Sequence, residues 1–328
     1  EVEAPDTGEK TDEARRVLCR IESARRPLIV SHIRLDGDAL GSALALCHLL
    51  RRRGASPHAV SDSAIPHIYR FLPGVEGAGL SPAALTGDYD LVIAVDTPAW
   101  SRTGAMGRAL PRGVARVSID HHLPVERVGD PEWTDTRWSS TGEMIYALAR
   151  AGGWTIGPEA ATCLYVALMT DTGRFTFPNT TDRALHAAGD LVALGAEHVL
   201  AADKVYQDIP FGVLRLRAEA LAGVRLFADG RAAVMTISDE MLRRNGVDPI
   251  DTQEMADFPR AVAGVSVGVL LREMRAEGKV KVSLRARRGV NIEPAARALG
   301  GGGHREAAGA EPSGTLEEVE ARVRALLE

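Results

Sequence analysis

Histidine and aspartate residues gather at a few points of the sequence, and each point follows a short apolar run. The first run, 28–32, leads into His32, Asp36 and Asp38, with Gly37 between the two aspartates. Imidazole and carboxylate groups are ligands of divalent ions such as Mn²⁺. The spacing lets His32 and Asp36 reach one point while Asp38, across the Gly37 turn, reaches a neighbouring point. The alternative is a simple turn in which Asp38 caps the following helix.

Three further clusters have the same character. They are Asp96 at the end of the apolar run 91–96, Asp120-His121-His122 at the end of the run 115–120, and Asp171 after the apolar helix predicted over 159–170. Each is explained singly by a helix cap or a solvated loop. Four such clusters at the ends of successive elements are difficult to explain by chance, and together they predict a metal centre.

The elements around these clusters alternate between strands and helices. Strands are predicted at 28–32, 57–61, 91–96 and 115–120, and helices at 39–53, 139–150, 159–170 and 181–194. This alternation predicts a parallel sheet with right-handed crossovers. Ligands of such sheets bind beyond the carboxyl ends of the strands, which is where the clusters fall.

The second half of the sequence predicts a different pattern of elements. It shows a hairpin over 224–237 with its turn at Asp229-Gly230, strands at 263–274 and 279–286, a glycine-rich loop at 300–303 and a closing helix near 315–327. We therefore expect an α/β protein with an N-terminal three-layer parallel-sheet domain, a smaller mixed-sheet C-terminal domain and an active site in the cleft between them. The expected divisions are a polar leader 1–16, a catalytic domain 17–198, a linker 199–218 and a substrate-binding domain 219–328.

Composition agrees with a two-domain enzyme. The 328 residues exceed the about 250–300 that one core usually holds, and 45% are hydrophobic.

We find no apolar stretch of the about 20 residues that span a bilayer, no signal-peptide pattern and no CxxC among the three cysteines, so we expect a cytoplasmic protein without membrane association. The net charge of −5 argues against coating of long polyanions, whereas ten Lys or Arg against three Asp or Glu in 260–305 suit a small anionic substrate.

With HxxxDGDAxGS, VDT, DHH and TDTG, the chain resembles the DHH phosphoesterase family, which includes RecJ-type exonucleases, family II pyrophosphatases and small oligoribonucleases. The segment 300–304, followed by AAGA, is similar to the GGGH motif of the second domain associated with that family. The segment order and TDTGRFTFPNTT most resemble the bacterial bifunctional oligoribonucleases and 3′-phosphoadenosine 5′-phosphate phosphatases. Leu35 stands where the family commonly has Pro, which alters turn stiffness rather than ligand chemistry.

The resemblance implies a pair of divalent ions that share one aspartate. It implies that the first ion is held by His32, Asp36 and Asp96, and the second by Asp38, Asp96, His121 and Asp171. The ions are expected to be Mn²⁺, with Mg²⁺ or Co²⁺ as alternatives. Such a pair activates water at neutral pH and stabilises the transition state of phosphoryl transfer.

Three residues near these ligands are candidates for catalysis or substrate contact. Asp120 is expected to orient a ligand through a hydrogen bond. His122 is expected to contact the scissile phosphate or to act as general acid, the alternative being a ring that packs at the strand end. Arg102, in the loop after Asp96, is either a contact to substrate phosphate or a solvated surface residue.

The second domain is expected to bind the rest of the substrate. The candidate residues are Ser283, Arg285 and Arg287 on one face of a strand, and Gly301, Gly302, Gly303 and His304 in the glycine-rich loop. Guanidinium groups bind a terminal phosphate through two parallel hydrogen bonds, and exposed backbone N–H groups also bind phosphate. The alternative for the arginines is an edge strand protected by charge.

The expected activity is that of a Mn²⁺-dependent phosphodiesterase. It would degrade very short oligoribonucleotides, including linear dinucleotides, to mononucleotides and convert 3′-phosphoadenosine 5′-phosphate to AMP. A RecJ-like exonuclease should have a longer chain and an extended basic groove. An inorganic pyrophosphatase and a non-catalytic nucleotide-binding regulator are further alternatives, the latter disfavoured because every ligand position is filled. The oligomeric state is open, with a homodimer as one option.

Overall fold

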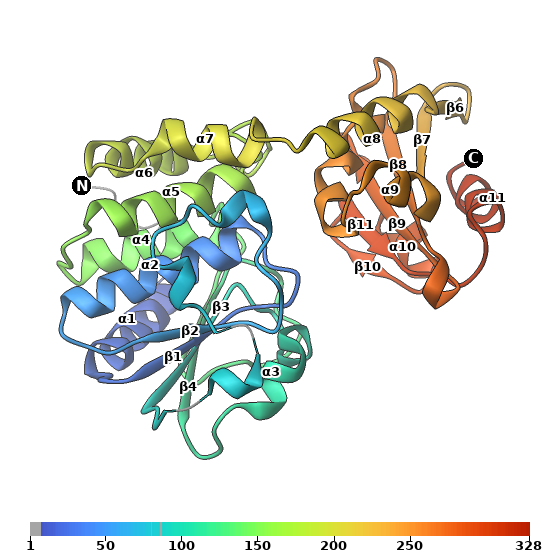
Figure 1. Ribbon diagram of the computed structural model, residues 1–328. Coiled ribbons are helices and arrows are strands. Elements are labelled where there is room, and N and C mark those ends of the chain that lie inside the picture. The colour runs from blue at the N-terminus through green and yellow to red at the C-terminus, as the bar shows by residue number, and fades with distance from the viewer. Residues whose placement is uncertain (1–7, 80, 86) are drawn as a thin grey trace. The chain divides into compact units, whose positions relative to one another are not determined.

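The computed structural model describes residues 8–79, 81–85 and 87–328, and the chain divides into two compact units after Asp208. Each unit has its own sheet and its own helices (Figure 1). The predicted linker 199–218 contains the boundary but is largely helical, because α7 (His198–Tyr206) and α8 (Phe211–Ala222) fill it.

The first unit is built on a parallel sheet of five strands in the order β2-β1-β3-β4-β5. The strands are β1 (Pro27–Val30), β2 (His58–Val60), β3 (Leu91–Val95), β4 (Ala115–Asp120) and β5 (Glu132–Thr134). Four of them confirm the predicted strands. The sequence did not predict β5, whose three residues contribute only one buried side chain, that of Trp133.

Both faces of this sheet are covered. Neighbouring side chains of a strand point to opposite faces, so Ile29 of β1 joins the large core whereas Leu28 and Val30 join a smaller one. Packed on the large-core side are α2 (Gly37–Arg52), α4 (Thr141–Ala151), α5 (Pro158–Asp171) and α6 (Asp182–Ala193). The short helix α3 (Gly104–Ala109) contributes Met106 to the smaller core. The predicted three-layer α/β class is confirmed.

The N-terminal segment differs from the predicted leader 1–16. Residues 1–7 lie outside the described part of the chain, and α1 (Gly8–Ser23) begins immediately after them. Val17 and Ile21, one helical turn apart, are fully buried in the large core. The many charged residues of the segment hid this apolar stripe, which anchors the helix.

The second unit contains a mixed sheet of six strands in the order β10-β11-β9-β8-β7-β6. The strands are β6 (Arg225–Phe227), β7 (Ala232–Ile237), β8 (Val267–Met274), β9 (Lys279–Ala286), β10 (Gly302–Gly303) and β11 (Ala307–Ala310). Only the pair β7–β8 is parallel among these strands. The hairpin turn between β6 and β7 lies at Asp229 and Gly230 as predicted, both with positive φ.

Strict alternation along β9 separates the two faces of this sheet. Val280, Val282 and Leu284 are buried in a core that α10 (Glu293–Ala298) and α11 (Leu316–Leu327) complete. The helices α8 and α9 (Asp239–Asn245) pack into a separate cluster with side chains of β7. Within the part of the chain that the structure describes, every helix is too short or too polar to cross a lipid bilayer.

Core packing of the first unit gives a test of this fold. Ile93 lies fully buried in the central strand β3, and its replacement by Ala should lower the free energy of unfolding by about 2–5 kcal/mol. All four tryptophans lie in the first unit, so urea unfolding followed by tryptophan fluorescence reports on it. Val125→Ala, at a side chain that is 76% exposed, is the matched control. Equal stabilities of the two variants would contradict the assigned core.

Candidate metal centre

The carboxyl ends of three neighbouring strands lie at one edge of the first unit's sheet. His32 comes two residues after β1, Asp96 directly follows β3, and Asp120 ends β4. The strands β1, β3 and β4 are parallel neighbours, so these residues lie side by side where open α/β sheets bind ligands. Asp171 joins them as the last residue of α5, which packs on α2.

The turn after β1 serves both as a helix cap and as a source of ligands. Asp36 is the N-cap of α2, and its Oδ1 accepts a hydrogen bond from Ala39 N at 2.9 Å, so the alternative of Asp38 as the cap is wrong. Asp38 lies in the first turn of the helix. Gly37 between them is required by close packing, because a Cβ atom there would lie 2.3 Å from Thr170 Oγ1. Because only Oδ1 of Asp36 caps the helix, its Oδ2 remains available to the site.

The first ligand group is His32, Asp36 and Asp96. His32 Nε2 lies 3.2 Å from Asp96 Oδ2 and 3.6 Å from Asp36 Oδ2. On the other side of the ring, His32 Nδ1 lies 2.7 Å from the carbonyl oxygen of Ile33. A proton donated to that carbonyl leaves the Nε2 lone pair directed at the two carboxylates, which is the orientation that a metal-binding imidazole has.

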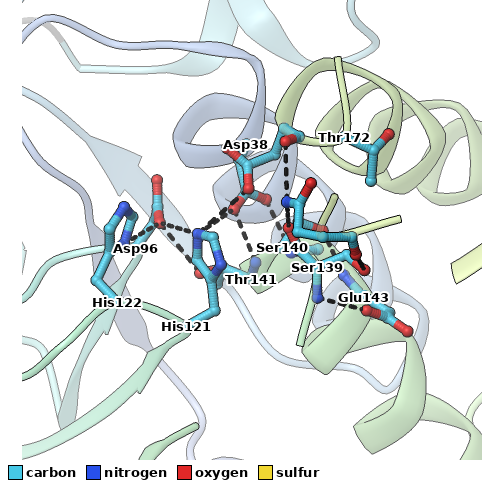
Figure 2. Close-up of polar contacts among 12 residues, drawn as sticks. Asp38, Asp96, His121, His122, Ser139, Ser140, Thr141, Glu143 and Thr172 are labelled. Carbon is cyan, nitrogen blue, oxygen red and sulfur yellow. Dashed lines mark hydrogen bonds and ion pairs between the residues drawn. The ribbon is translucent and has the colours of Figure 1, made fainter. Parts of the chain in front are cut away.

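The second group surrounds His121. Its Nε2 lies 3.7 Å from Asp38 Oδ2, 3.6 Å from Asp96 Oδ1 and 3.5 Å from Asp171 Oδ2 (Figure 2). This buried nitrogen has no hydrogen-bond partner among the described residues. A buried polar atom without a partner is costly unless something else satisfies it. A divalent cation among one imidazole and three carboxylates would do so, and the donor set fits such an ion.

The charges of the two groups are strongly coupled. Burial raises the pKa of Asp38, and the charges of Asp96 and Asp171 raise it further. Burial, together with Asp96 and Asp36, also raises the pKa of Asp171. Burial of Asp96 acts in the same direction, but hydrogen bonds from His122 and His32 outweigh it and hold the pKa of Asp96 well below its usual range. The centre therefore attracts positive charge, either as protons or as metal ions.

Asp120 and His122 form a pair beside the metal ligands. Asp120 Oδ1 accepts hydrogen bonds from the backbone N and from Nδ1 of His122, at 3.0 and 2.9 Å. His122 Nδ1 also lies 3.2 Å from Asp96 Oδ1. Burial alone would lower the pKa of His122, but these hydrogen bonds raise it to about 12. His122 is also placed to contribute to an ion together with Asp96 and His121, an assignment that the sequence did not suggest.

The structure adds a segment that the sequence analysis missed. This segment, residues 139–143, contains the start of α4 at Thr141. Thr141 donates hydrogen bonds to both Asp38 and Asp96. Ser140 is the N-cap, and its Oγ accepts a hydrogen bond from Glu143 N at 3.0 Å. The pattern Ser-x-x-Glu before an apolar helix is a helix-start signal that could have directed attention to this point.

Arg102 lies on the short 3-10 helix Trp100–Thr103 after Asp96, and it is exposed. Its carbonyl oxygen accepts a hydrogen bond from Ile33 N at 2.7 Å, so the loops after β1 and β3 are joined. The role of its guanidinium toward substrate stays a prediction.

The predicted substrate-binding residues of the second unit fall into two groups. Ser283 and Arg285 share one face of β9, as the alternation predicts, and burial lowers the pKa of Arg285. Arg287 lies just past the strand, and its guanidinium donates hydrogen bonds to the carbonyl oxygens of Val265 and Val262. These hydrogen bonds stabilise the turn that precedes β8.

The glycine-rich segment forms a short strand rather than an open loop. Gly302 and Gly303 constitute β10 and pair with β11. A Cβ atom on Gly301 would lie 2.0 Å from the carbonyl oxygen of Gly309, so glycine is required for the close approach of this segment to β11. The backbone N of His304 donates a hydrogen bond to Ala307 O at 2.8 Å.

Comparison with known families agrees with the division into two units. Residues 26–168 match the DHH family, N-terminal domain, and residues 229–328 match the DHHA1 domain. The chain is 32% identical to the bifunctional oligoribonuclease and PAP phosphatase NrnA of Thermus thermophilus, over 90% of this chain and 87% of that one. It is 30% identical to the protein of the same name from Bacillus subtilis, over 85% and 87%.

Solved structures show the same fold. An exopolyphosphatase-related protein from Bacteroides fragilis superposes with a TM-score of 0.88 at 26% identity, covering 96% of both chains. The RecJ protein of Thermus thermophilus, in complex with Mn²⁺, gives a TM-score of 0.55 at 18% identity, over 98% of this chain and 55% of that one. At that identity, the likeness to RecJ concerns the fold alone.

Metal binding to this centre should release protons and should strengthen as the pH rises. The raised pKa values of Asp38, Asp171 and His32 mean that the metal-free protein holds protons that a cation must displace. Raising the pH from about 6 to about 8 removes competing protons and should tighten binding. Calorimetric titration with Mn²⁺ in two buffers with different ionisation enthalpies measures the number of protons that are released on binding. Binding with no proton release would contradict these protonation states.

Proposed function

Because the chain belongs to the DHH family, we propose that it is a hydrolase that cleaves very short oligoribonucleotides to mononucleotides and converts 3′-phosphoadenosine 5′-phosphate to AMP. The observation that carries the proposal is the environment of His121 Nε2, a buried nitrogen surrounded by three carboxylates. Two relatives that match most of the chain are named for both activities.

We assign the two ligand groups to two divalent ions, most suitably Mn²⁺, with Mg²⁺ or Co²⁺ as alternatives. His32, Asp36 and Asp96 would hold one ion, and the other would be held by Asp38, Asp96, His121 and Asp171. Bound ions would supply an activated water at neutral pH and charge stabilisation for the phosphoryl transition state. Asp96 belongs to both groups because its two oxygens face different histidines.

His122 is the residue best placed to move a proton. Its Nδ1 is held by Asp120, and its side chain is 28% exposed, so the opposite nitrogen is the one that can reach substrate. A protonated His122 could donate to the oxygen that leaves phosphorus. Asp120 would orient this ring and keep it charged, as its hydrogen bonds to His122 indicate.

The second unit would bind the part of the substrate that does not react. Arg285 and Ser283 are our candidates for a terminal phosphate, together with the backbone and His304 of the segment 301–304. The half-buried position of Arg285 supports this role, since a guanidinium partly withdrawn from water gains from an anionic partner. Arg287 is the weaker candidate, because its guanidinium donates to two backbone carbonyls, whereas that of Arg285 donates to one, that of Leu284.

A substrate panel tests the function. With Mn²⁺ present, turnover of a dinucleotide and of 3′-phosphoadenosine 5′-phosphate should exceed turnover of a 24-mer RNA, long single-stranded DNA and pyrophosphate. Asp96→Asn should remove both activities, with a loss greater than the about 10- to 100-fold typical of residues that only orient ligands. Preference for the 24-mer or for DNA would support a RecJ-like exonuclease instead, and full activity after chelation and gel filtration would exclude the metal mechanism.

Arg285 gives a separate test of the second unit. Arg285→Gln should raise KM for a 5′-phosphorylated dinucleotide by about 10- to 100-fold, the equivalent of one charge-assisted hydrogen bond, while kcat changes little. Arg288→Gln, at an exposed neighbour, is the matched control. An unchanged KM for Arg285→Gln would remove this residue from the substrate site.

A further inference from the structure

The sharing of Asp96 between two ligand groups sets a geometric requirement. Asp96 Oδ2 lies 3.2 Å from His32 Nε2, whereas Asp96 Oδ1 lies 3.6 Å from His121 Nε2. The carboxylate can serve both groups only while its plane keeps one rotation about the Cβ–Cγ bond. A carboxylate torsion of this kind is broad by itself. In the metal-free protein His32 and His122 each contact one oxygen of Asp96; a donor that binds no ion is needed to fix the carboxylate independently of them.

The hydroxyl of Thr141 is placed to do this. Thr141 Oγ1 donates a hydrogen bond to Asp96 Oδ1 at 3.2 Å, and both side chains are buried. In Figure 2, Thr141 lies close to the histidines and carboxylates of the centre. A donor on Oδ1 holds that oxygen toward the His121 group and thereby keeps Oδ2 toward His32.

Thr141 also contacts the second carboxylate. Its backbone N donates to Asp38 Oδ2 at 2.7 Å, and Gly142 N donates to Asp38 Oδ1 at 2.8 Å. These two N–H groups belong to the first turn of α4 and have no acceptor within the helix. Residue 142 is glycine because a Cβ atom there would lie 2.5 Å from Ala167 Cβ and 3.4 Å from Asp38 Oδ1. The first turn of α4 thus contacts carboxylates from two other segments, Asp38 through its backbone and Asp96 through the Thr141 hydroxyl.

The segment that carries Thr141 is itself held firmly. Ser139 N donates to Glu143 Oε2 at 2.8 Å, and the other carboxylate oxygen accepts from Arg183 Nε at 2.7 Å. Asn179 Nδ2 donates to the carbonyl oxygens of Ser139 and Asp171, at 3.0 and 3.1 Å. The buried pair Glu143–Arg183 and the amide of Asn179 therefore tie the start of α4 to α6 and to the end of α5.

We propose that Thr141 is a positioning residue that sets the metal affinity of the centre by fixing the orientation of Asp96 between its two ligand groups. The proposal rests on the two-ion assignment of the proposed function. It goes further by naming a residue that binds no ion and that acts through the shared ligand. Residues that orient metal ligands typically contribute about 10- to 100-fold to metal affinity.

The test compares variants of the full chain stripped of metal by chelation and gel filtration. Thr141→Val keeps the shape and the backbone N–H but removes the hydroxyl, whereas Thr141→Ser keeps the hydroxyl. Mn²⁺ binding is measured from the electron paramagnetic resonance signal of free Mn²⁺. We expect Thr141→Val to weaken binding by about 10- to 100-fold and Thr141→Ser to remain close to wild type.

A control separates positioning from general packing. Thr162→Val removes another buried hydroxyl, one that donates to Pro158 O at the opposite end of α5 from Asp171 and contacts no ligand, and it should leave Mn²⁺ affinity unchanged. Thermal unfolding of the stripped proteins shows whether each variant folds, and Thr141→Ala replaces Thr141→Val if the latter does not. Wild-type affinity in a folded variant without the hydroxyl would overturn the proposal. Absence of Mn²⁺ binding by the wild type would instead refute the proposed function.

Discussion

Mutual repulsion among carboxylates that are buried together at a sheet edge is the constraint on which the first unit depends. Asp38 and Asp96 are each only 1% exposed, and Asp171 approaches the same histidine. Removing such charges from water is costly unless counter-charges and hydrogen bonds replace the lost hydration. Three histidines, two backbone amides and two hydroxyls, those of Thr141 and Ser42, supply part of that compensation. Divalent cations would supply the rest and would convert a destabilising cluster into a reactive one.

The fold meets this constraint with elements that are rigid for other reasons. The parallel strands place their carboxyl ends together because hydrogen-bonded pairing fixes their register. The packing of α2 on α5 fixes the DGD turn against Asp171, with Gly37 permitting the contact. The backbone of Asp96 has a φ of 54°, an uncommon value for a residue other than glycine, and its N–H is bonded to Ile119 O. Strain of this kind at a ligand indicates that the surroundings determine its position.

The sequence predicted the parts of this centre that depend on local patterns. Apolar runs that end in His and Asp predicted β1, β3 and β4 and the gathering of these side chains at one sheet edge, and the motifs predicted the family. It did not predict Thr141, because that residue meets Asp96 and Asp38 across 45 and 103 positions of the chain, and no local pattern encodes such contacts. The same holds for Arg287, whose strand alternation suggested a phosphate contact but whose guanidinium bonds to carbonyls 22 and 25 positions away. In α1, a high density of charge concealed a two-residue apolar stripe.

The central claim is that the two ligand groups hold two cations that share Asp96. Anomalous X-ray diffraction from crystals of the full chain grown with Mn²⁺ tests this claim directly. The account predicts two anomalous peaks per chain, one bounded by His32, Asp36 and Asp96 and the other by Asp38, His121 and Asp171. A map with no peak at these residues, from protein that hydrolyses a dinucleotide in the same Mn²⁺ solution, would contradict it.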